Sequence, residues 1–238
     1  SRRISPSLTT SPSCFFHSMI SPSCISTPSL GIIISKARIS TAISLTNSSP
    51  VNSVPNLSMW LEASDDTSFL DTETYSGNTV SIWYDKNKSG FTKTNATQVT
   101  NANKPTYSNA INNIYSIKFD GTSDFLNVNG SILNNTNYTI FVVDKRLSNK
   151  IDNYFIGDSS NTTNNQTLIL GYNTNTGVIH SQGTSNSYTS SITGYVGDKN
   201  EPKIFSFIHN SSSGKKTYIN GMLTGQSNNT SKDRKSVV

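Results

Sequence analysis

The stretch that decides the fold is residues 80–125, VSIWYDKNKSGFTKTNATQVTNANKPTYSNAINNIYSIKFDGTSDF. It opens with a short run, residues 80–84, in which apolar and polar side chains alternate as they do in a half-buried β-strand. Residues 85–90 have the composition of a turn and end in a glycine, which can adopt a positive φ. A second alternating run, residues 115–119, stops at Asp120-Gly121. Two such strands separated by turn-rich chain predict antiparallel β-structure.

Strand patterns continue on the C-terminal side of this stretch at intervals of roughly ten residues. Residues 138–143 form the most apolar run and are predicted to be a central strand buried on both faces. Residues 204–208 read as another strand, and Asn220-Gly221 between two short apolar-rich runs predicts a type I′ hairpin. No segment has the residue spacing of a helix. The sequence therefore predicts an all-β fold, an antiparallel β-sandwich of jelly-roll type.

A further strand is predicted on the N-terminal side of the stretch. In residues 57–63 every second side chain is apolar, which indicates a strand with one buried face. The two tryptophans of the chain, Trp60 and Trp83, lie in strand patterns beside aliphatic residues. This setting favours a place in the core over the alternative role of a platform on which a sugar stacks.

Composition divides the chain into three parts. Residues 1–50 repeat Ser-Pro-Ser, contain no Asp or Glu and hold both cysteines, so we interpret them as a disordered Ser/Pro-rich segment or as non-authentic sequence. Residues 51–231 are predicted to form the β-sandwich domain. Residues 232–238 resemble the translation of a sequencing adapter. The domain is accordingly expected to be incomplete at its C-terminal end.

The formal net charge of +5 arises outside the predicted domain. Residues 1–50 carry four basic residues and no acidic one, whereas residues 51–231 carry 12 basic and 13 acidic residues. A nucleic-acid-binding protein needs positive charge on the folded face that meets phosphate, so nucleic acid is not an expected partner. No apolar run approaches the ~20 residues of a membrane span, so none is expected.

The motifs within and around residues 80–125 resemble the concanavalin A-like lectin/glucanase superfamily, and more narrowly its laminin-G-like (LamG) modules. The residues that carry the resemblance are Trp83, Asp85, Lys86, Gly90, Ala96, Thr97, Gln98, Pro105, Thr106, Tyr107, Phe119, Asp120, Gly121, Asp124 and Phe125. The resemblance implies a jelly roll of the kind found in lectins, glycan hydrolases and adhesive modules. It also implies an extracellular, cell-surface or virion location.

Glycosidases of this superfamily use glutamates that alternate along one strand, because alternation places the carboxylates on one face beside the scissile bond. The chain has only three glutamates, Glu62, Glu73 and Glu201, and none has this spacing. We therefore predict a non-catalytic recognition module that binds a glycan or a surface protein within a larger secreted, cell-surface or virion protein. The alternative is a glycoside hydrolase or lyase, or its inactive remnant.

Three tyrosines in predicted loops, Tyr172, Tyr188 and Tyr195, are the candidate ligand-binding residues, since aromatic rings stack on the C–H faces of sugars. Asp65 and Asp66 are the candidate ligands of a structural Ca²⁺, because hard cations need clustered oxygen atoms. The alternative for this pair is a turn or helix cap. No cofactor is predicted to be required.

Two histidines, His180 and His209, are candidates for a catalytic base or for metal ligands. Neither lies in a sequence context that matches a known nucleophile motif or triad. We therefore predict that both are strand-surface residues.

Overall fold

The computed structural model describes residues 31–35, 54–87, 93–133, 136–157, 167–174, 177–184, 187–190, 199–228 and 230. Within these ranges the chain forms β-strands and four short 3-10 helices, so the prediction of an all-β antiparallel fold is confirmed. The 3-10 helices are η2 (Asp66–Ser68), η3 (Asp71–Glu73), η4 (Asn101–Asn103) and η5 (Gly130–Leu133). None of the helices described is long or apolar enough to cross a membrane.

The larger sheet has six strands in the order β14-β13-β12-β7-β1-β2, and all its pairs are antiparallel. Its strands are β1 (Gly31–Ser35), β2 (Leu57–Glu62), β7 (Tyr138–Lys145), β12 (Pro202–Asn210), β13 (Gly214–Ile219) and β14 (Met222–Ser227). The run at 138–143 is confirmed as a central strand, since β7 lies between β12 and β1. Its burial on both faces is only partial, because Phe141 and Val143 are partly exposed.

The predicted hairpin between β13 and β14 is confirmed. Asn220 and Gly221 join the two strands with φ values of 50° and 80°. Positive φ at both central residues is the signature of a type I′ turn, whose twist matches that of the strands it connects. Asn220 is a residue type that tolerates this conformation, and its side-chain Oδ1 accepts a hydrogen bond from the backbone N–H of Ile204 at 2.9 Å.

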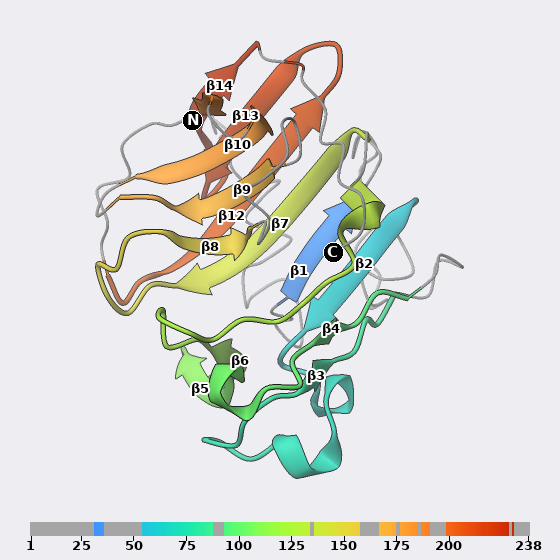
Figure 1. The fold of residues 1–238 in the computed structure, drawn as a ribbon, viewed down its shortest axis with the longest axis vertical. Coiled ribbons are helices and arrows are strands. Elements are labelled where there is room, and N and C mark those ends of the chain that lie inside the picture. Colours follow the sequence, from blue (N-terminus) through green and yellow to red (C-terminus); the bar gives the residue numbers. More distant parts are fainter. Residues whose placement is uncertain are drawn as a thin grey trace, which may run out of the picture.

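The smaller sheet has four antiparallel strands in the order β11-β10-β9-β8. They are β8 (Asn153–Ile156), β9 (Thr167–Tyr172), β10 (Val178–Thr184) and β11 (Ser187–Ser190). Figure 1 shows this sheet lying over the larger one, with β8, β9 and β10 in front of β7 and β12. Aromatic contacts join the layers: the ring of Phe155 lies 5.0 Å from that of Phe205, and the ring of Tyr172 lies 5.9 Å from it.

Two small antiparallel sheets extend the core beyond the two layers. One pairs β3 (Ile82–Trp83) with β4 (Ala96–Thr97), and the other pairs β5 (Thr106–Ile111) with β6 (Ile114–Lys118). Phe69 contacts both, because its ring stacks on Trp83 at 6.0 Å and meets Tyr107 edge-on at 5.0 Å. Trp83 is 7% exposed and Trp60 is 3% exposed, so both tryptophans belong to the core as predicted.

Strand β2 differs from the expected half-buried strand. Its residues from Leu57 to Leu61 are all buried, including the polar Ser58. One face joins the main core, and on the other face Trp60 packs with Val54 and Leu57 in a second, smaller cluster. The alternation of apolar and polar side chains was therefore a poor guide to exposure here, because both faces of this strand carry buried side chains.

Strand β1 also differs from expectation, because it comes from residues 1–50. Its five residues, GIIIS, pair with β2 on one side and with β7 on the other. Ile33 lies opposite Trp60 in β2 and opposite Phe141 in β7. A run of three β-branched residues favours an extended strand, which accounts for this position inside a sheet. The other residues of this segment lie outside those described.

Candidate functional site

Asp85, from the motif that carries the family resemblance, is a buried hub of hydrogen bonds. It is 1% exposed, and its Oδ1 accepts from the backbone N–H groups of Trp60 and Asn87, each at 2.9 Å. Its Oδ2 accepts from the backbone N–H of Thr94 at 3.0 Å. One carboxylate thus ties its own turn to strand β2, 25 residues away, and to Thr94, nine residues on, and its charge is balanced by three oriented N–H dipoles.

The chain next to Asp85 completes the edge of β2. The backbone N–H of Lys86 donates to the carbonyl of Trp60 at 2.8 Å, and the side-chain amide of Asn87 donates to the carbonyl of Leu57 at 2.8 Å. Because β2 is the last strand of the larger sheet, these bonds satisfy backbone groups that would otherwise be free to pair with another chain. Residues 85–87 therefore serve the fold as an edge cover.

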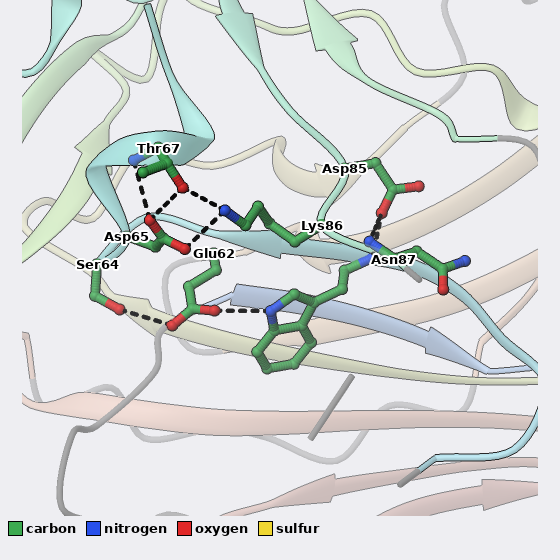
Figure 2. A network of polar contacts seen from close by, with 8 residues as sticks. Glu62, Ser64, Asp65, Thr67, Asp85, Lys86 and Asn87 are labelled. Atoms are coloured by element: carbon green, nitrogen blue, oxygen red, sulfur yellow. Dashed lines mark hydrogen bonds and ion pairs between the residues drawn. The ribbon is translucent and has the colours of Figure 1, made fainter. Parts of the chain in front are cut away.

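Asp65, one of the two predicted metal residues, lies beside this edge cover, in the network drawn in Figure 2. Asp65 caps η2 through a hydrogen bond from the Thr67 backbone N–H at 3.0 Å, and its Oδ2 forms an ion pair with the Lys86 ammonium at 2.8 Å. Partial burial acts to raise the pKa of Asp65, but the bonds from Lys86 and Thr67 outweigh it and lower that pKa. Asp66 is exposed.

This geometry gives Asp65 the alternative role foreseen for it, that of a cap. A positive ammonium already occupies the carboxylate oxygen that a calcium ion would need. Among the residues that the structure describes, no three His, Cys, Asp or Glu side chains gather as possible metal ligands. Calcium binding at this pair therefore stays a prediction without support from its surroundings.

Tyr172 is not the loop aromatic that was predicted. It ends β9, is 4% exposed and packs in the core, where Phe155 meets its ring edge-on at 5.3 Å. Its hydroxyl donates to Asp144 Oδ2 at 2.8 Å, and the Arg146 guanidinium lies 4.2 Å from its ring centroid. A ring covered in this way has no open face for a sugar, so Tyr172 is a core residue and the prediction that it binds a ligand is wrong.

Asp144 lies near the end of β7, Arg146 directly follows that strand, and both side chains contact Tyr172. Burial raises the pKa of Asp144, although the Tyr172 hydroxyl and the charge of Arg146 act in the opposite direction. Arg146 is 7% exposed, and its Nη2 donates to the carbonyls of Lys150 at 2.6 Å and of Thr174 at 3.3 Å. Its own carbonyl accepts from the backbone N–H of Asn200 at 2.9 Å. Arg146 therefore ties together three loops.

A fourth loop joins this group through Lys150. The Lys150 ammonium donates to the carbonyl of Asp120 at 3.1 Å and to the hydroxyl of Thr122. The loop 120–124 is itself rigidly closed, because the Asp120 carboxylate accepts from three of its backbone N–H groups. These bonds hold the pKa of Asp120 far below its usual value. We call the loops at 120–124, 146–152, 173–174 and 199–200 the Arg146 loop cluster.

Large apolar side chains are exposed on or next to the Arg146 loop cluster. They are Phe119 at 43%, Phe125 at 46%, Leu147 at 45%, Ile151 at 54% and Tyr154 at 38% exposure. The hydroxyl of Tyr154 donates to Asp152 Oδ1 at 2.8 Å, which fixes the orientation of its ring. These exposed rings lie close in sequence or space to the polar side chains of Lys150, Asp152 and Asn153. This combination makes the Arg146 loop cluster the best candidate surface for ligand recognition among the described residues.

Sequence reasoning placed the ligand site on loops but named other tyrosines. Tyr188 lies in β11, and of this residue the structure describes only the backbone. Tyr195 lies outside the described residues. The signal that was available for the Arg146 loop cluster is the run Phe119-Asp-Gly-Thr-Ser-Asp-Phe125, in which two aromatic residues flank a tight acidic turn.

The two histidines are not the strand-surface residues that were predicted. His180 is 0% exposed and His209 is 1% exposed, and both lie between the two sheets. Residues directly opposite each other on paired strands point to the same face of the sheet. His180 lies opposite the buried Leu170, and His209 lies opposite the buried Tyr138, so both histidines point inward.

Comparisons with models of known protein families, with curated proteins and with solved structures found no match.

Proposed function

We propose that this chain is a laminin-G-like jelly roll of the concanavalin A-like superfamily and that it serves as a non-catalytic module that recognises carbohydrate. In this proposal the module belongs to a larger secreted, cell-surface or virion protein. Two antiparallel sheets packed face to face are compatible with this architecture. The residues that resemble the superfamily motif include Asp85, which has a structural role here: its carboxylate accepts hydrogen bonds from the backbone N–H groups of Trp60 and Thr94.

The observation that carries the proposal is the Arg146 loop cluster. Its loops are held in place by hydrogen bonds from Arg146 and Lys150, so a ligand would meet a surface that is already ordered. Preorganisation of this kind lowers the entropy that binding has to overcome. Exposed rings, such as those of Phe119 and Phe125, offer apolar surface for sugar C–H groups, and the nearby amide, ammonium and carboxylate groups suit sugar hydroxyls.

The glutamates speak against the alternative of a hydrolase. Glu62 accepts from Trp60 Nε1 at 2.9 Å, Glu73 is buried and accepts from Ser81 at 2.9 Å, and Glu201 is exposed ahead of β12. A pair of catalytic carboxyl groups has to flank the scissile bond from one shared cleft. Two of these three side chains already serve local hydrogen bonds, which supports a binding role.

The proposal is tested by carbohydrate binding to matched alanine variants. Laminarin, β-glucans and agar-type polymers are titrated into the wild type and into Tyr154→Ala and Phe119→Ala, and affinity is measured by calorimetry. Loss of a stacking ring is expected to weaken binding about tenfold. The control is Tyr75→Ala, since Tyr75 is 70% exposed in a turn outside the loop cluster. Tyr188→Ala and Tyr195→Ala extend the series to the two tyrosines named from the sequence.

Three results would contradict the proposal. The first is equal binding by Tyr154→Ala, Phe119→Ala and Tyr75→Ala. The second is a folded wild type that binds none of the polymers. The third is turnover of a polymer that Glu62→Gln abolishes, which would establish the hydrolase alternative instead.

A further inference from the structure

A row of polar, titratable side chains crosses the inside of the molecule at the end opposite the Arg146 loop cluster. In the larger sheet Tyr138, His209 and Lys215 lie side by side on β7, β12 and β13, because His209 is in register with both of the others. All three are at most 2% exposed. From the smaller sheet, His180 of β10 meets this row, and its ring centroid lies 5.9 Å from that of Tyr138.

His180 joins the two sheets through both of its ring nitrogens. Its Nε2 lies 2.9 Å from the hydroxyl of Tyr138, and its Nδ1 lies 3.5 Å from the hydroxyl of Thr217 on β13. Phe207 of β12 meets the ring edge-on at 5.5 Å. A neutral imidazole offers one acceptor and one donor, which fits a hydroxyl on each side. Protonation removes the acceptor, so one of the two bonds, with Tyr138 or with Thr217, has to rearrange.

The groups that face His180 are neutral or positive. The titratable ones among the described side chains are Tyr138 from β7, His209 from β12 and Lys215 from β13, and β9 presents the apolar Leu170. The carboxylates of the described residues that are buried lie elsewhere: Glu73 and Asp85 accept hydrogen bonds in the β2 to β4 region, and Asp144 accepts from Tyr172 near the other end of β7. A second positive charge in this layer is therefore opposed by the charge of Lys215 and by lost hydration.

We propose that His180 is an acid-sensitive latch: neutral, it holds the smaller sheet against β7 and β13, and its protonation below neutral pH releases that sheet. The latch goes beyond the proposed recognition function, because none of its residues belongs to the Arg146 loop cluster. With a ligand surface at one end and a latch at the other, acidification can loosen the module without any ligand being involved.

The direction of the pH effect follows from burial. Desolvation, Lys215 and His209 hold the pKa of His180 well below its usual value of 6.5 and outweigh a hydrogen bond with the backbone of Lys216, which acts to raise it. The unfolded chain therefore binds a proton at a higher pH than the folded chain does, and stability falls as pH drops below about 6.5. For one such histidine the folding equilibrium constant falls by up to about tenfold per pH unit.

The first test is made on the wild type. The imidazole carbon and nitrogen resonances of the ¹³C,¹⁵N-labelled protein are followed by NMR between about pH 8 and pH 4.5. His180 is expected to stay neutral well below the pH at which a free histidine titrates, and the cross-sheet contacts of β10 are expected to be lost once it is protonated. A His180 signal that titrates near pH 6.5 with β10 unchanged would overturn the proposal.

The second test compares the pH dependence of the urea midpoint in two variants. His180→Phe keeps a ring in place but cannot be protonated. Between about pH 6.5 and pH 5 its folding equilibrium constant should therefore fall less steeply than that of the wild type, by a factor of up to about ten per pH unit. Thr217→Val is the control, because it removes a hydroxyl next to His180 and leaves the imidazole in place. It should keep the wild-type slope. A slope in His180→Phe equal to that of the wild type would contradict the latch, and the NMR titration decides if this variant does not fold.

Discussion

Two buried polar regions of this protein show opposite ways of placing a titratable group in a β-sheet core. Asp85 is 1% exposed and is surrounded by three backbone N–H groups that point at its carboxylate. His180 is 0% exposed and is surrounded by hydroxyls, a second histidine and Lys215. The first environment stabilises a charge, whereas the second accommodates only a neutral ring. Burial alone therefore does not determine what a buried polar group contributes.

The largest effect is expected from removing the compensated charge. Asp85→Ala leaves the backbone N–H groups of Trp60, Asn87 and Thr94 without their shared acceptor and frees the segment that covers the edge of β2. Each buried donor left unsatisfied costs about 1–3 kcal/mol, so for three donors we expect a loss of at least about 3 kcal/mol in the free energy of unfolding. Urea denaturation measures it. Asp66→Ala, at an exposed neighbour of the same network, should change stability by less than about 0.5 kcal/mol.

If Asp85→Ala were as stable as Asp66→Ala, the hydrogen bonds to the Asp85 carboxylate would not contribute to stability. The claim that this environment, unlike that of His180, stabilises a charge would then be wrong. Aggregation of Asp85→Ala with native-like secondary structure would instead indicate that exposing the edge of β2 matters more than the lost hydrogen bonds.

A smaller effect, with a characteristic pH window, is expected from Lys215 in the second region. Burial lowers the pKa of Lys215 from 10.5 to about 8. Between these values the unfolded chain carries the proton and the folded chain does not, so stability should rise as pH increases from about 8 to 10.5. Lys215→Met removes the titrating group and should remove this rise, a difference on the order of 2 kcal/mol. Urea midpoints of both proteins at pH 7.5, 8.5 and 9.5 would show it. Parallel pH profiles would mean that the ammonium is well solvated.

The two regions also differ in how far the sequence revealed them. Asp85 lies in a local motif, a strand followed by a turn, so the strand before it could be predicted, whereas the partner of that strand, β4 (Ala96–Thr97), was not. His180 and His209 could not be placed, because the side of a strand that faces inward depends on its register with strands that are distant in sequence. The same limit explains Tyr172, which looked like a loop residue beside Asn173 but ends β9 inside the core.

Cover from distant segments was the second thing that local patterns could not show. The polar Ser58 sits in an alternating run and was expected to be exposed, yet residues 85–87 close the edge of β2 beside it. The strand GIIIS was likewise not predicted, because the segment around it is rich in Ser and Pro. Its five residues nevertheless pair with β2 on one side and with β7 on the other. Alternation predicts that a strand exists, and its neighbours decide which faces are buried.

The smallest effect is expected at the surface of the Asp85 region, where a charge pair meets solvent. Asp65 and Lys86 pair at 2.8 Å with side chains that are 32% and 24% exposed, so Lys86→Met should cost less than about 1 kcal/mol, and less still at high salt.

With Lys86 in place, calcium at about 1 mM should leave the thermal midpoint of the wild type unchanged, because the ammonium occupies the oxygen that the ion needs. A calcium-dependent rise that Asp65→Asn abolishes would instead restore the metal site predicted from the sequence. A rise seen only in Lys86→Met would show that the ammonium, rather than a lack of oxygen ligands, keeps calcium out of this turn.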